Sequence, residues 1–491
     1  MNRRRAISTA LFVLSLAACT HAAQAQNITL KTLPIPTGEQ FLLSPSQTMG
    51  MGSTGIAFDD AEGRPFSNPA LWLRGGDPIR LFVAPTFYGE TNQWVGGRTL
   101  PMSGLFTGNR VHGGFALAVQ QVQNRGALWG WPVVDAGGRS IREDPANNYL
   151  FATVGARLTD RFSAGVSIFQ ASLGAVDGVN MLYGRARSIE QDGTLSEVRL
   201  GFAGDLGQGR ALEGTVTTTR VDIVHDVGYV EWIWESAPGH APPVMREWDE
   251  RNEDYTVSWG TRLRYTHPVG EVSRLGVILA ATTKDHPKIP NYNVVDIPRD
   301  PGNSAVFNLG VGASQSENGS TLSMEVIFEP GQSHTWAFAD TTIALPSGAT
   351  LQAGDRTVDN QFRFKNWNVG VGFQKELDRT AWQMGLRVRQ VNYTLDQHNY
   401  LAEEQRDTRE SWMEWTPSWG ALLKLGGMEL RYAGRFTTKG WPDTVWFGVT
   451  RADFAQAGPG VDFVVGPTGP VNIPAFRVTT HRITASIPFG R

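Results

Sequence analysis

The chain has 491 residues, 55 of them glycine, and a formal net charge of −3, which is the wrong sign for a protein that holds nucleic acid through phosphate contacts. After the N-terminal region no apolar run approaches the roughly 18 residues of a membrane-spanning helix, and the mean hydropathy is −0.24, so a helical membrane protein is excluded. A transmembrane β-barrel is compatible with this hydropathy, because its strands alternate lipid-facing apolar with lumen-facing polar residues.

Residues 1–25 have the composition of an export signal. Residues 3–5 are arginines, residues 10–18 are a short apolar run, and Ala23-Gln24-Ala25 is a small-x-small cleavage site. An alternative uses Cys19, because residues 16–19 also have the pattern of a lipoprotein acylation site. Cys19 is the only cysteine of the chain, so cleavage after Ala25 leaves no disulfide, thiolate metal site or cysteine nucleophile.

Residues 26–78 contain no strand pattern, and residues 46–73 are rich in glycine and small side chains. Residues 50–55 formally match the G-x-G-x-x-G pattern of dinucleotide sites. That fingerprint needs a buried strand before it and a helix after it, and this segment offers neither. We expect the glycines to serve close backbone packing instead.

The segment resembles the N-terminal plug of the FadL-type outer-membrane transporters of hydrophobic compounds. The resemblance rests on three motifs, at residues 49–52 (MGMG), 57–60 (AFDD) and 68–70 (NPA). It implies a plug over residues 26–78 inside a barrel formed by residues 79–491, in the bacterial outer membrane. It also implies that plug residues contact or gate the ligand path, and the candidates are Gly50, Gly52, Asp59, Asp60, Asn68 and Pro69.

Each of these motifs also has a structural interpretation. Asp59 and Asp60 are adjacent on an extended segment, so their carboxylates point apart and one site cannot easily use both. Capping, or pairing with arginines of the lumen, is the alternative to a metal-binding or catalytic role. Asn68-Pro69-Ala70 would turn the plug into the first strand, and this is compatible with a gating role.

From residue 79 onward the chain alternates strands of about ten residues, short turns and longer polar loops, which is the pattern of an all-β transmembrane antiparallel barrel. Tight turns are predicted at residues 158–161, 205–209, 267–270, 316–319, 376–379 and 426–427. Counting hairpins from Phe115 gives about 14 strands. A further hairpin over residues 79–106 would make 16.

The strand patterns predict which side chains face the lumen. In residues 162–169, Phe162, Val166 and Ile168 share one face, and Ser163 and Ser167 share the other. Some strands place arginines on the polar face, namely Arg262, Arg264, Arg387 and Arg389. A solid β-sandwich would not bury such charges, whereas a polar lumen can pair or solvate them.

The longer loops carry the aromatic clusters. They are predicted at residues 225–254, 284–303, 332–359, 396–410 and 438–475, on the outer side of the membrane. Trp232, Trp234, Trp441 and Trp446 are the candidates for capture of a hydrophobic ligand there.

No motif for a cofactor or a reaction is visible. The nine histidines form no H-x-H or H-E-x-x-H pattern, and no G-x-S-x-G elbow or phosphate loop is present. We therefore expect no metal, no cofactor and no enzyme activity. A catalytic Ser/His pair brought together only by the fold, as in barrel-embedded lipases, is the alternative.

The leading hypothesis is passive uptake of hydrophobic small molecules, fatty acids or aromatic hydrocarbons by the resemblance. Its implied partners are the ligand, outer-membrane lipid and the barrel assembly machinery, with no nucleic acid. One alternative is a barrel scaffold or shuttle of an outer-membrane secretion system, in which the loops would bind a protein. A general diffusion channel is a third alternative, and a plug argues against it.

Overall fold

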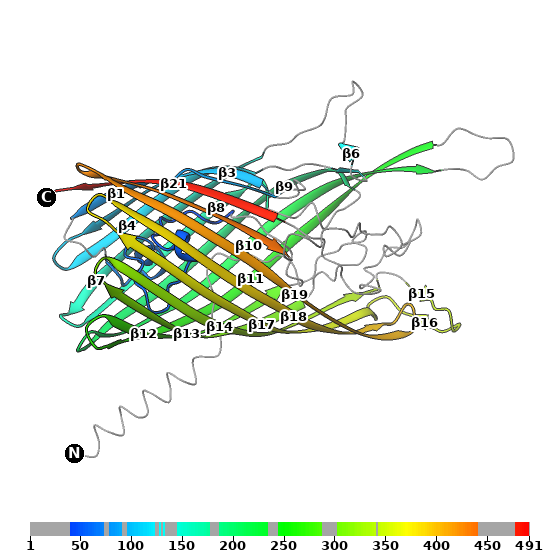
Figure 1. The fold of residues 1–491 in the computed structure, drawn as a ribbon. Helices are drawn as coiled ribbons and strands as arrows, with labels where there is room; N and C mark the ends of the chain where they lie inside the picture. Colours follow the sequence, from blue (N-terminus) through cyan, green and yellow to red (C-terminus); the bar gives the residue numbers. More distant parts are fainter. Residues whose placement is uncertain are drawn as a thin grey trace, which may run out of the picture.

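The computed structural model describes residues 40–72, 78–90, 96–122, 127–128, 131–132, 145–176, 186–233, 244–286, 302–339, 342–439 and 477–490. Most of these residues form one large antiparallel sheet closed into a barrel (Figure 1). None of the helices among them is long and apolar enough to cross a membrane. The predicted signal, residues 1–25, lies outside the described residues.

The barrel wall is built from strands that mostly pair with their neighbours in the sequence. They are β1 (Ile79–Val83), β2 (Thr86–Glu90), β3 (Gly96–Thr107), β4 (Val111–Val122), β7 (Ala146–Thr159), β8 (Phe162–Leu173), β9 (Ala186–Gly207), β10 (Arg210–Ile233), β11 (Val244–Val269), β12 (Ser273–His286), β13 (Gly302–Glu317), β14 (Ser320–Phe338), β17 (Arg356–Glu376), β18 (Thr380–Asn399), β19 (Glu404–Leu425), β20 (Met428–Lys439) and β21 (Arg477–Phe489). Two short hairpins lie outside this sheet, β5 (Ala127–Leu128) with β6 (Trp131–Pro132), and β15 (Ile343–Ala344) with β16 (Thr350–Leu351).

The barrel closes where the last strand meets the first. β1 and β2 both lie between β3 and β21, so they are two halves of one wall position, and the described strands form a 16-strand barrel. The expected count of about fourteen is therefore wrong, and the hairpin over residues 79–106 is part of the wall. Its first arm was hard to recognise because Ala84 and Pro85 divide it into two short pieces.

The predicted tight turns are confirmed. Each of the six joins two neighbouring wall strands, for example β13 to β14 at Asn318-Gly319, where both residues have positive φ (51° and 67°). These turns lie at the end of the barrel that also holds the C-terminus, on the left in Figure 1. Short turns face the periplasm in barrels of this type, so the opposite end is extracellular.

The strands extend further than the sequence suggested. The predicted loop over residues 396–410 is mostly the continuation of β18 and β19, joined by a turn at residues 400–403. Of the predicted loop over residues 225–254, residues 225–233 likewise continue β10 and residues 244–254 belong to β11, and the residues between them lie outside the described ranges. β11 has 26 residues, far more than the roughly 9–11 that cross the bilayer. Residues 246–254 of β11 are polar or charged except for Trp248, so no period-2 hydrophobic pattern marks this part of the strand.

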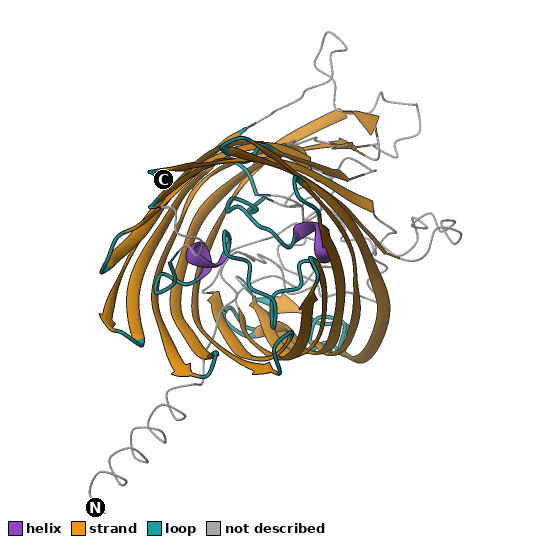
Figure 2. Cartoon of the chain, turned by 60° about the vertical axis from the view of Figure 1, so that its left-hand side comes forward, coloured by secondary structure: helices purple, strands orange, loops and turns teal. Residues whose placement is uncertain are grey.

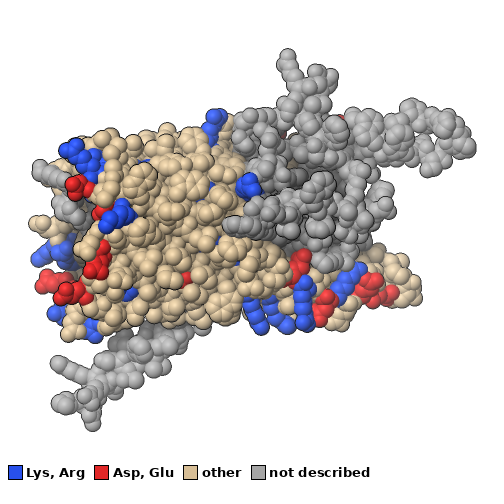
Figure 3. Space-filling model, viewed as in Figure 1, with Lys and Arg blue, Asp and Glu red and all other residues tan. Residues whose placement is uncertain are grey.

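The outer face of the barrel is apolar and the inner face is polar over much of its circumference. On β8, Phe162, Val166 and Ile168 are 41%, 37% and 51% exposed, whereas Ser163 and Ser167 are 1% and 3% exposed. Figure 3 shows the result as a belt almost free of charge, with Lys, Arg, Asp and Glu at its two margins. The chain is thus a transmembrane barrel of the outer-membrane type.

Candidate functional site

Residues 40–72, which we call the lumen segment, lie inside the ring of strands (Figure 2). They contain two helical turns, the 3-10 helix η1 (Met49–Met51) and α2 (Arg64–Ser67). η1 lies against β17 to β20, and other parts of the segment bond to β4, β8 to β12 and β14. The segment is therefore fastened to most of the wall by side chains far from it in the sequence.

Glycines of the wall make room for its backbone at three places. A Cβ on Gly165 or Gly201 would lie 2.2 Å from the Pro69 carbonyl oxygen or 2.1 Å from Asn68 Oδ1. A Cβ on Gly276 would lie 2.4 Å from the Ile56 carbonyl oxygen, and a Cβ on Gly385 would lie 2.0 Å from the Gly52 nitrogen. These distances are far below van der Waals contact, so any larger residue would displace the segment.

Gly50 and Gly52 complete this contact from the segment side. A Cβ on Gly50 would lie 2.6 Å from Gln383 Oε1 and 2.9 Å from the Gly420 amide nitrogen. Gly52 has φ +66°, and its N–H donates to Ser418 Oγ at 2.8 Å. The two glycines thus serve close backbone packing, and no phosphate-binding helix follows them in the described chain.

Asp59 is the centre of a buried charge network. Its carboxylate accepts from Arg264 of β11 at 3.0 Å and from Arg274 of β12 at 2.7 Å, and it pairs with Arg64 of α2. Glu213 of β10 pairs with both Arg64 and Arg264. Burial lowers the pKa of the Arg64 guanidinium, but the charges of Glu213 and Asp59 outweigh burial, so the net shift of that pKa is upward. The network holds the segment against three wall strands.

Glu325 of β14 forms a second anchor. It is 4% exposed, and one carboxylate oxygen accepts from the amides of Gly55 and Ile56 at 2.8 and 3.1 Å. Its other oxygen accepts from Arg387 of β18 at 2.7 Å, and Arg387 also donates to the carbonyls of Gly52 and Ser53. The predicted lumen arginines Arg264 and Arg387 thus bind the lumen segment, and Arg389 lies 3.5 Å from Glu329 and 3.7 Å from Glu414.

Asp60 caps a turn inside the segment. Its carboxylate accepts from the Gly63 and Gln47 amides at 2.9 and 3.1 Å and from the Ser46 hydroxyl at 2.9 Å. Burial raises the pKa of Asp60, and these hydrogen bonds oppose that rise only in part. Asp59 and Asp60 therefore point to different partners, and one site does not use both.

Asn68-Pro69-Ala70 forms the turn that ends the segment. The Asn68 side chain donates to the Phe202 carbonyl at 3.1 Å, and its Oδ1 accepts from the Ala70 amide at 3.0 Å. The Pro69 carbonyl lies 3.1 Å from His112 Nε2 on β4. The turn is thus held by β4, β9 and β10, a few residues before β1 begins.

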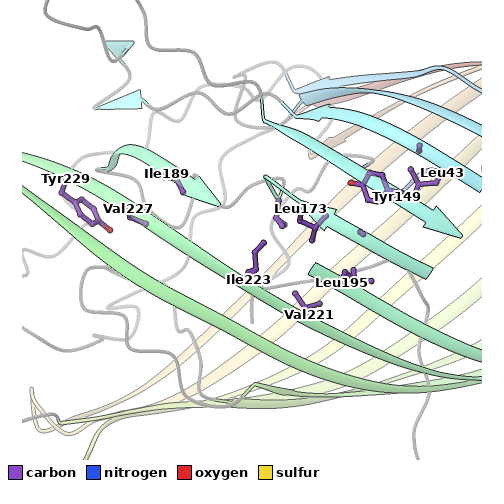
Figure 4. Close-up of a cluster of buried hydrophobic side chains, with 12 residues drawn as sticks. Leu43, Tyr149, Leu173, Ile189, Leu195, Val221, Ile223, Val227 and Tyr229 are labelled. Carbon is purple, nitrogen blue, oxygen red and sulfur yellow. The ribbon is translucent and has the colours of Figure 1, made fainter. Parts of the chain in front are cut away.

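Buried apolar side chains form a connected group on one side of the lumen, next to polar side chains of the same strands such as Gln120, Asn147 and Glu197, and we call this group the apolar sector. Its inner part packs Phe66 of α2 against wall residues of β1, β3, β4 and β7, namely Phe82, Leu105, Ala116 and Phe151. Its outer part is a larger cluster of residues of β4 and β7 to β10, with Val176 just after β8 and Leu43 of the lumen segment, partly labelled in Figure 4. The strand residues are Ala118, Tyr149, Ala171, Leu173, Ile189, Leu195, Val221, Ile223, Val227 and Tyr229. Phe169 packs against both parts and joins them.

Sequence reasoning did not single out the apolar sector. A signal was present, because Tyr149 and Phe151 on β7, and Phe169 and Leu173 on β8, share a face with the polar or small residues that were assigned to the lumen. Strands with apolar residues on both faces have one face toward lipid and the other toward an apolar interior.

The predicted capture residues fall largely outside the described part of the chain. Trp234, Trp441 and Trp446 are not described, and Trp232 belongs to β10 without a described side chain. Within the described ranges, no group of three or more His, Cys, Asp or Glu side chains could hold a metal ion.

No family model matches the sequence, and no curated protein matches it. Solved outer-membrane barrels resemble the structure. A FadL homologue of Pseudomonas aeruginosa aligns over 93% of this chain and 99% of its own, with 11% identity and a TM-score of 0.41. The toluene transporter TodX of Pseudomonas putida aligns over 90% and 97%, with 10% identity and a TM-score of 0.37. The iron transporter FrpB of Neisseria meningitidis aligns over 74% and 62%, with 10% identity and a TM-score of 0.39. Since transporters of different cargo score alike, this likeness carries no argument about function.

Proposed function

We propose that the protein is a FadL-like outer-membrane channel for passive uptake of hydrophobic small molecules, with no enzyme activity of its own. In this proposal residues 1–25 are the export signal, residues 26–78 form the plug and residues 79–491 form the barrel. Long-chain fatty acids and aromatic hydrocarbons are the ligand classes that the plug motifs suggest.

The observation that carries the proposal is the connected stripe of apolar side chains along one wall of the lumen. A channel for polar solutes gains nothing from an inner wall of Phe, Leu, Ile and Val side chains. The apolar sector extends from α2, beside β1, to the extracellular reach of β10. The strands β11, β14 and β18 present Arg264, Glu325 and Arg387 to the lumen instead, and the buried charges Glu197, Arg199 and Glu213 lie beside the sector on β9 and β10. Such a stripe supports movement of an apolar ligand along one wall.

An interrupted place in the wall adjoins the inner end of this stripe. Ala84 and Pro85 separate β1 from β2, and Pro101 of β3 lies opposite Ala84, whose N–H donates to the Pro101 carbonyl at 2.9 Å. Neither proline has an N–H to donate. The Ala84 carbonyl accepts from the Thr86 hydroxyl at 3.0 Å instead of from a neighbouring strand. We call this place the seam.

The seam supports a sideways exit into the bilayer. Phe82 lies two residues from Ala84 and belongs to the inner part of the apolar sector. A wall position that lacks two ladder donors opens at lower cost than an intact one. The step would be driven by partition into lipid, at about 0.8 kcal/mol per CH₂ group buried.

The lumen segment would act as the gate of this path. Gly50, Gly52, Asp59, Asp60, Asn68 and Pro69 are its candidate residues, since they hold the segment to the wall or shape its turns. Trp232, Trp234, Trp441 and Trp446 stay candidates for capture outside. A secretion scaffold is the alternative, and no described contact favours it.

Uptake of radiolabelled oleate and of toluene by cells with and without the protein tests the proposal. We expect uptake of at least one compound to depend on the protein and to fall severalfold in the variant Phe169→Gln, which places an amide where the two parts of the apolar sector meet. Ser333→Asn is the matched control, because Ser333 faces the lumen from β14, away from the apolar sector. Equal uptake with and without the protein would overturn the proposal, and capture of secreted proteins by the loops would then favour the scaffold.

A further inference from the structure

Three basic side chains face outward together at the extracellular margin of the barrel. Arg363 and Lys365 belong to β17 and Arg409 to β19, and all three are exposed. Thr394 of β18 pairs with both Arg363 and Arg409, so the two arginines lie in one row, about 10 Å apart between Cα atoms. Lys365 lies one row nearer the membrane. Figure 3 shows Lys and Arg, with Asp and Glu among them, beyond the uncharged belt on this side.

The neighbours of this cluster on the outer face indicate its depth relative to the bilayer. Trp367 of β17 and Met413 of β19 face outward next toward the membrane, and both are 45% exposed. Aromatic residues with apolar surroundings mark the boundary between hydrocarbon and headgroups. The three cations therefore lie where the headgroups of the outer leaflet begin.

These cations differ from three other exposed cations of the extracellular half. Arg220 and Arg251 pair with Asp222 and Asp226, each at 3.4 Å, and Arg356 pairs with Asp359. For Arg363, Lys365 and Arg409 the described part of the chain supplies no ion pair. Three like charges that form no ion pair within the described chain attract an external anion.

Polar groups fill the space between the cations. Ser411 Oγ donates to Asn392 Oδ1 at 2.6 Å, and the Asn392 side chain donates to the Lys365 carbonyl at 2.8 Å. On the inner face of the same strands Phe362, Tyr393 and Leu395 pack with Phe364 and Trp412. That packing holds the three strands as a sheet beyond the membrane, so the cations keep their spacing without a ligand.

The next row outward limits the site. Asp396 of β18 and Asp407 of β19 are opposite each other in the strand register there, so two negative charges occupy this row. Positive charge is therefore confined to the two rows beside the membrane. An anion is favoured at headgroup depth and disfavoured further out. This profile fits a lipid headgroup better than a soluble anion.

From this geometry we infer that Arg363, Lys365 and Arg409 bind the phosphorylated saccharide headgroup of lipid A in the outer leaflet. Arginine forks match phosphate oxygens, and the lysine adds a point charge closest to the acyl chains. The polar groups of Asn392 and Ser411 lie beside the saccharide. The site is separate from the uptake path, since it is on the outer face of the wall.

Lipid A retention by the purified full chain in detergent tests this inference, with native mass spectrometry as the readout. We expect wild type to retain bis-phosphorylated lipid A and to release it as salt rises. The triple variant R363Q/K365Q/R409Q should bind on the order of a hundredfold more weakly, at about fivefold for each cation removed. The variant R220Q/R251Q/R356Q removes as much charge from paired positions and should bind as wild type does.

A variant of the acidic row and two other lipids complete the test. D396N/D407N should tighten binding, because it removes the negative row. Weakened binding by this variant would overturn the inference, since a carboxylate-bound cation would then hold the phosphates. Equal retention of dephosphorylated lipid A or of phosphatidylglycerol, or unchanged binding by the basic triple variant, would also overturn it. Heat-modifiable migration on gels establishes that each variant is folded.

Discussion

Replacing Asp59 by asparagine would test whether the charge network keeps the lumen segment in place. The substitution preserves size and one acceptor oxygen but removes the charge that faces Arg64, Arg264 and Arg274. Glu213 remains as a partner of Arg64 and Arg264. The variant therefore weakens the network without leaving either of these two arginines without a carboxylate.

The structure sets the size of the effect. Removing one partner of a buried ion pair costs about 3–5 kcal/mol. The Asp59 side chain is 19% exposed, and Glu213 and the new amide keep part of the pairing. We therefore expect about 2 kcal/mol, and this loss should fall on local opening of the segment. Since about 1.4 kcal/mol corresponds to a tenfold change, amide exchange through that opening should rise about 30-fold.

Hydrogen–deuterium exchange of the purified barrel measures this directly. Peptides covering residues 50–60 should exchange faster in Asp59→Asn, and peptides from β10 and β14 should not change. Asp378→Asn is the matched control, because Asp378 is an exposed residue in a turn between β17 and β18. If the segment gates the path, uptake by the same variant should rise.

Unchanged exchange in residues 50–60 would refute the reasoning, since the network would then contribute nothing to holding the segment. Faster exchange throughout the barrel would refute it differently, by showing that the network stabilises the wall. Reduced uptake with faster exchange would contradict the gate and assign Asp59 to the ligand path itself.

Three more outcomes follow from the same contacts. Gly165→Leu should displace the turn at Pro69 while the barrel still assembles, whereas Gly89→Ala should have no effect, because its Cβ would meet nothing within 4 Å. Protease cleavage within residues 60–72 of folded barrels measures the difference. Equal cleavage of the two variants would show that Gly165 does not make room for the turn. Pro85→Val should restore a donor at the seam, stabilise the wall and slow uptake severalfold; unchanged uptake would place the exit elsewhere. Because burial raises the pKa of Asp60 above its ordinary value, its charged form is penalised at neutral pH and the segment gains stability as pH falls through the raised pKa toward 3.8. Asp60→Asn should lack this gain, and parallel pH profiles of exchange for the two proteins would show that Asp60 does not titrate as argued.

The sequence by itself determined the class of the fold and much of its register. The period-2 alternation on strands such as β8 and the turn chemistry at Asn318-Gly319 are local properties, so they could be recognised without any contact. The lumen-facing arginines were predicted for the same reason: a side chain's face follows from its parity along the strand. The lengths of β10, β11, β18 and β19 were not predicted, because beyond the membrane their outer faces are polar and charged, as in a loop. The inner faces of β10 and β18 stay apolar there, at Val227 and Tyr229 and at Tyr393 and Leu395.

Only the tertiary structure decided the partners. Asp59 meets Arg264 and Arg274 from more than 200 residues away, and the wall glycines meet the lumen segment only because the barrel closes around it. The apolar sector needs seven wall strands side by side before its residues become one surface. The basic cluster at Arg363, Lys365 and Arg409 likewise depends on the register between β17, β18 and β19. Alternation and turn preferences act over a few residues and are written in the local sequence, whereas closure and register bring distant residues together and are fixed only when the whole wall forms.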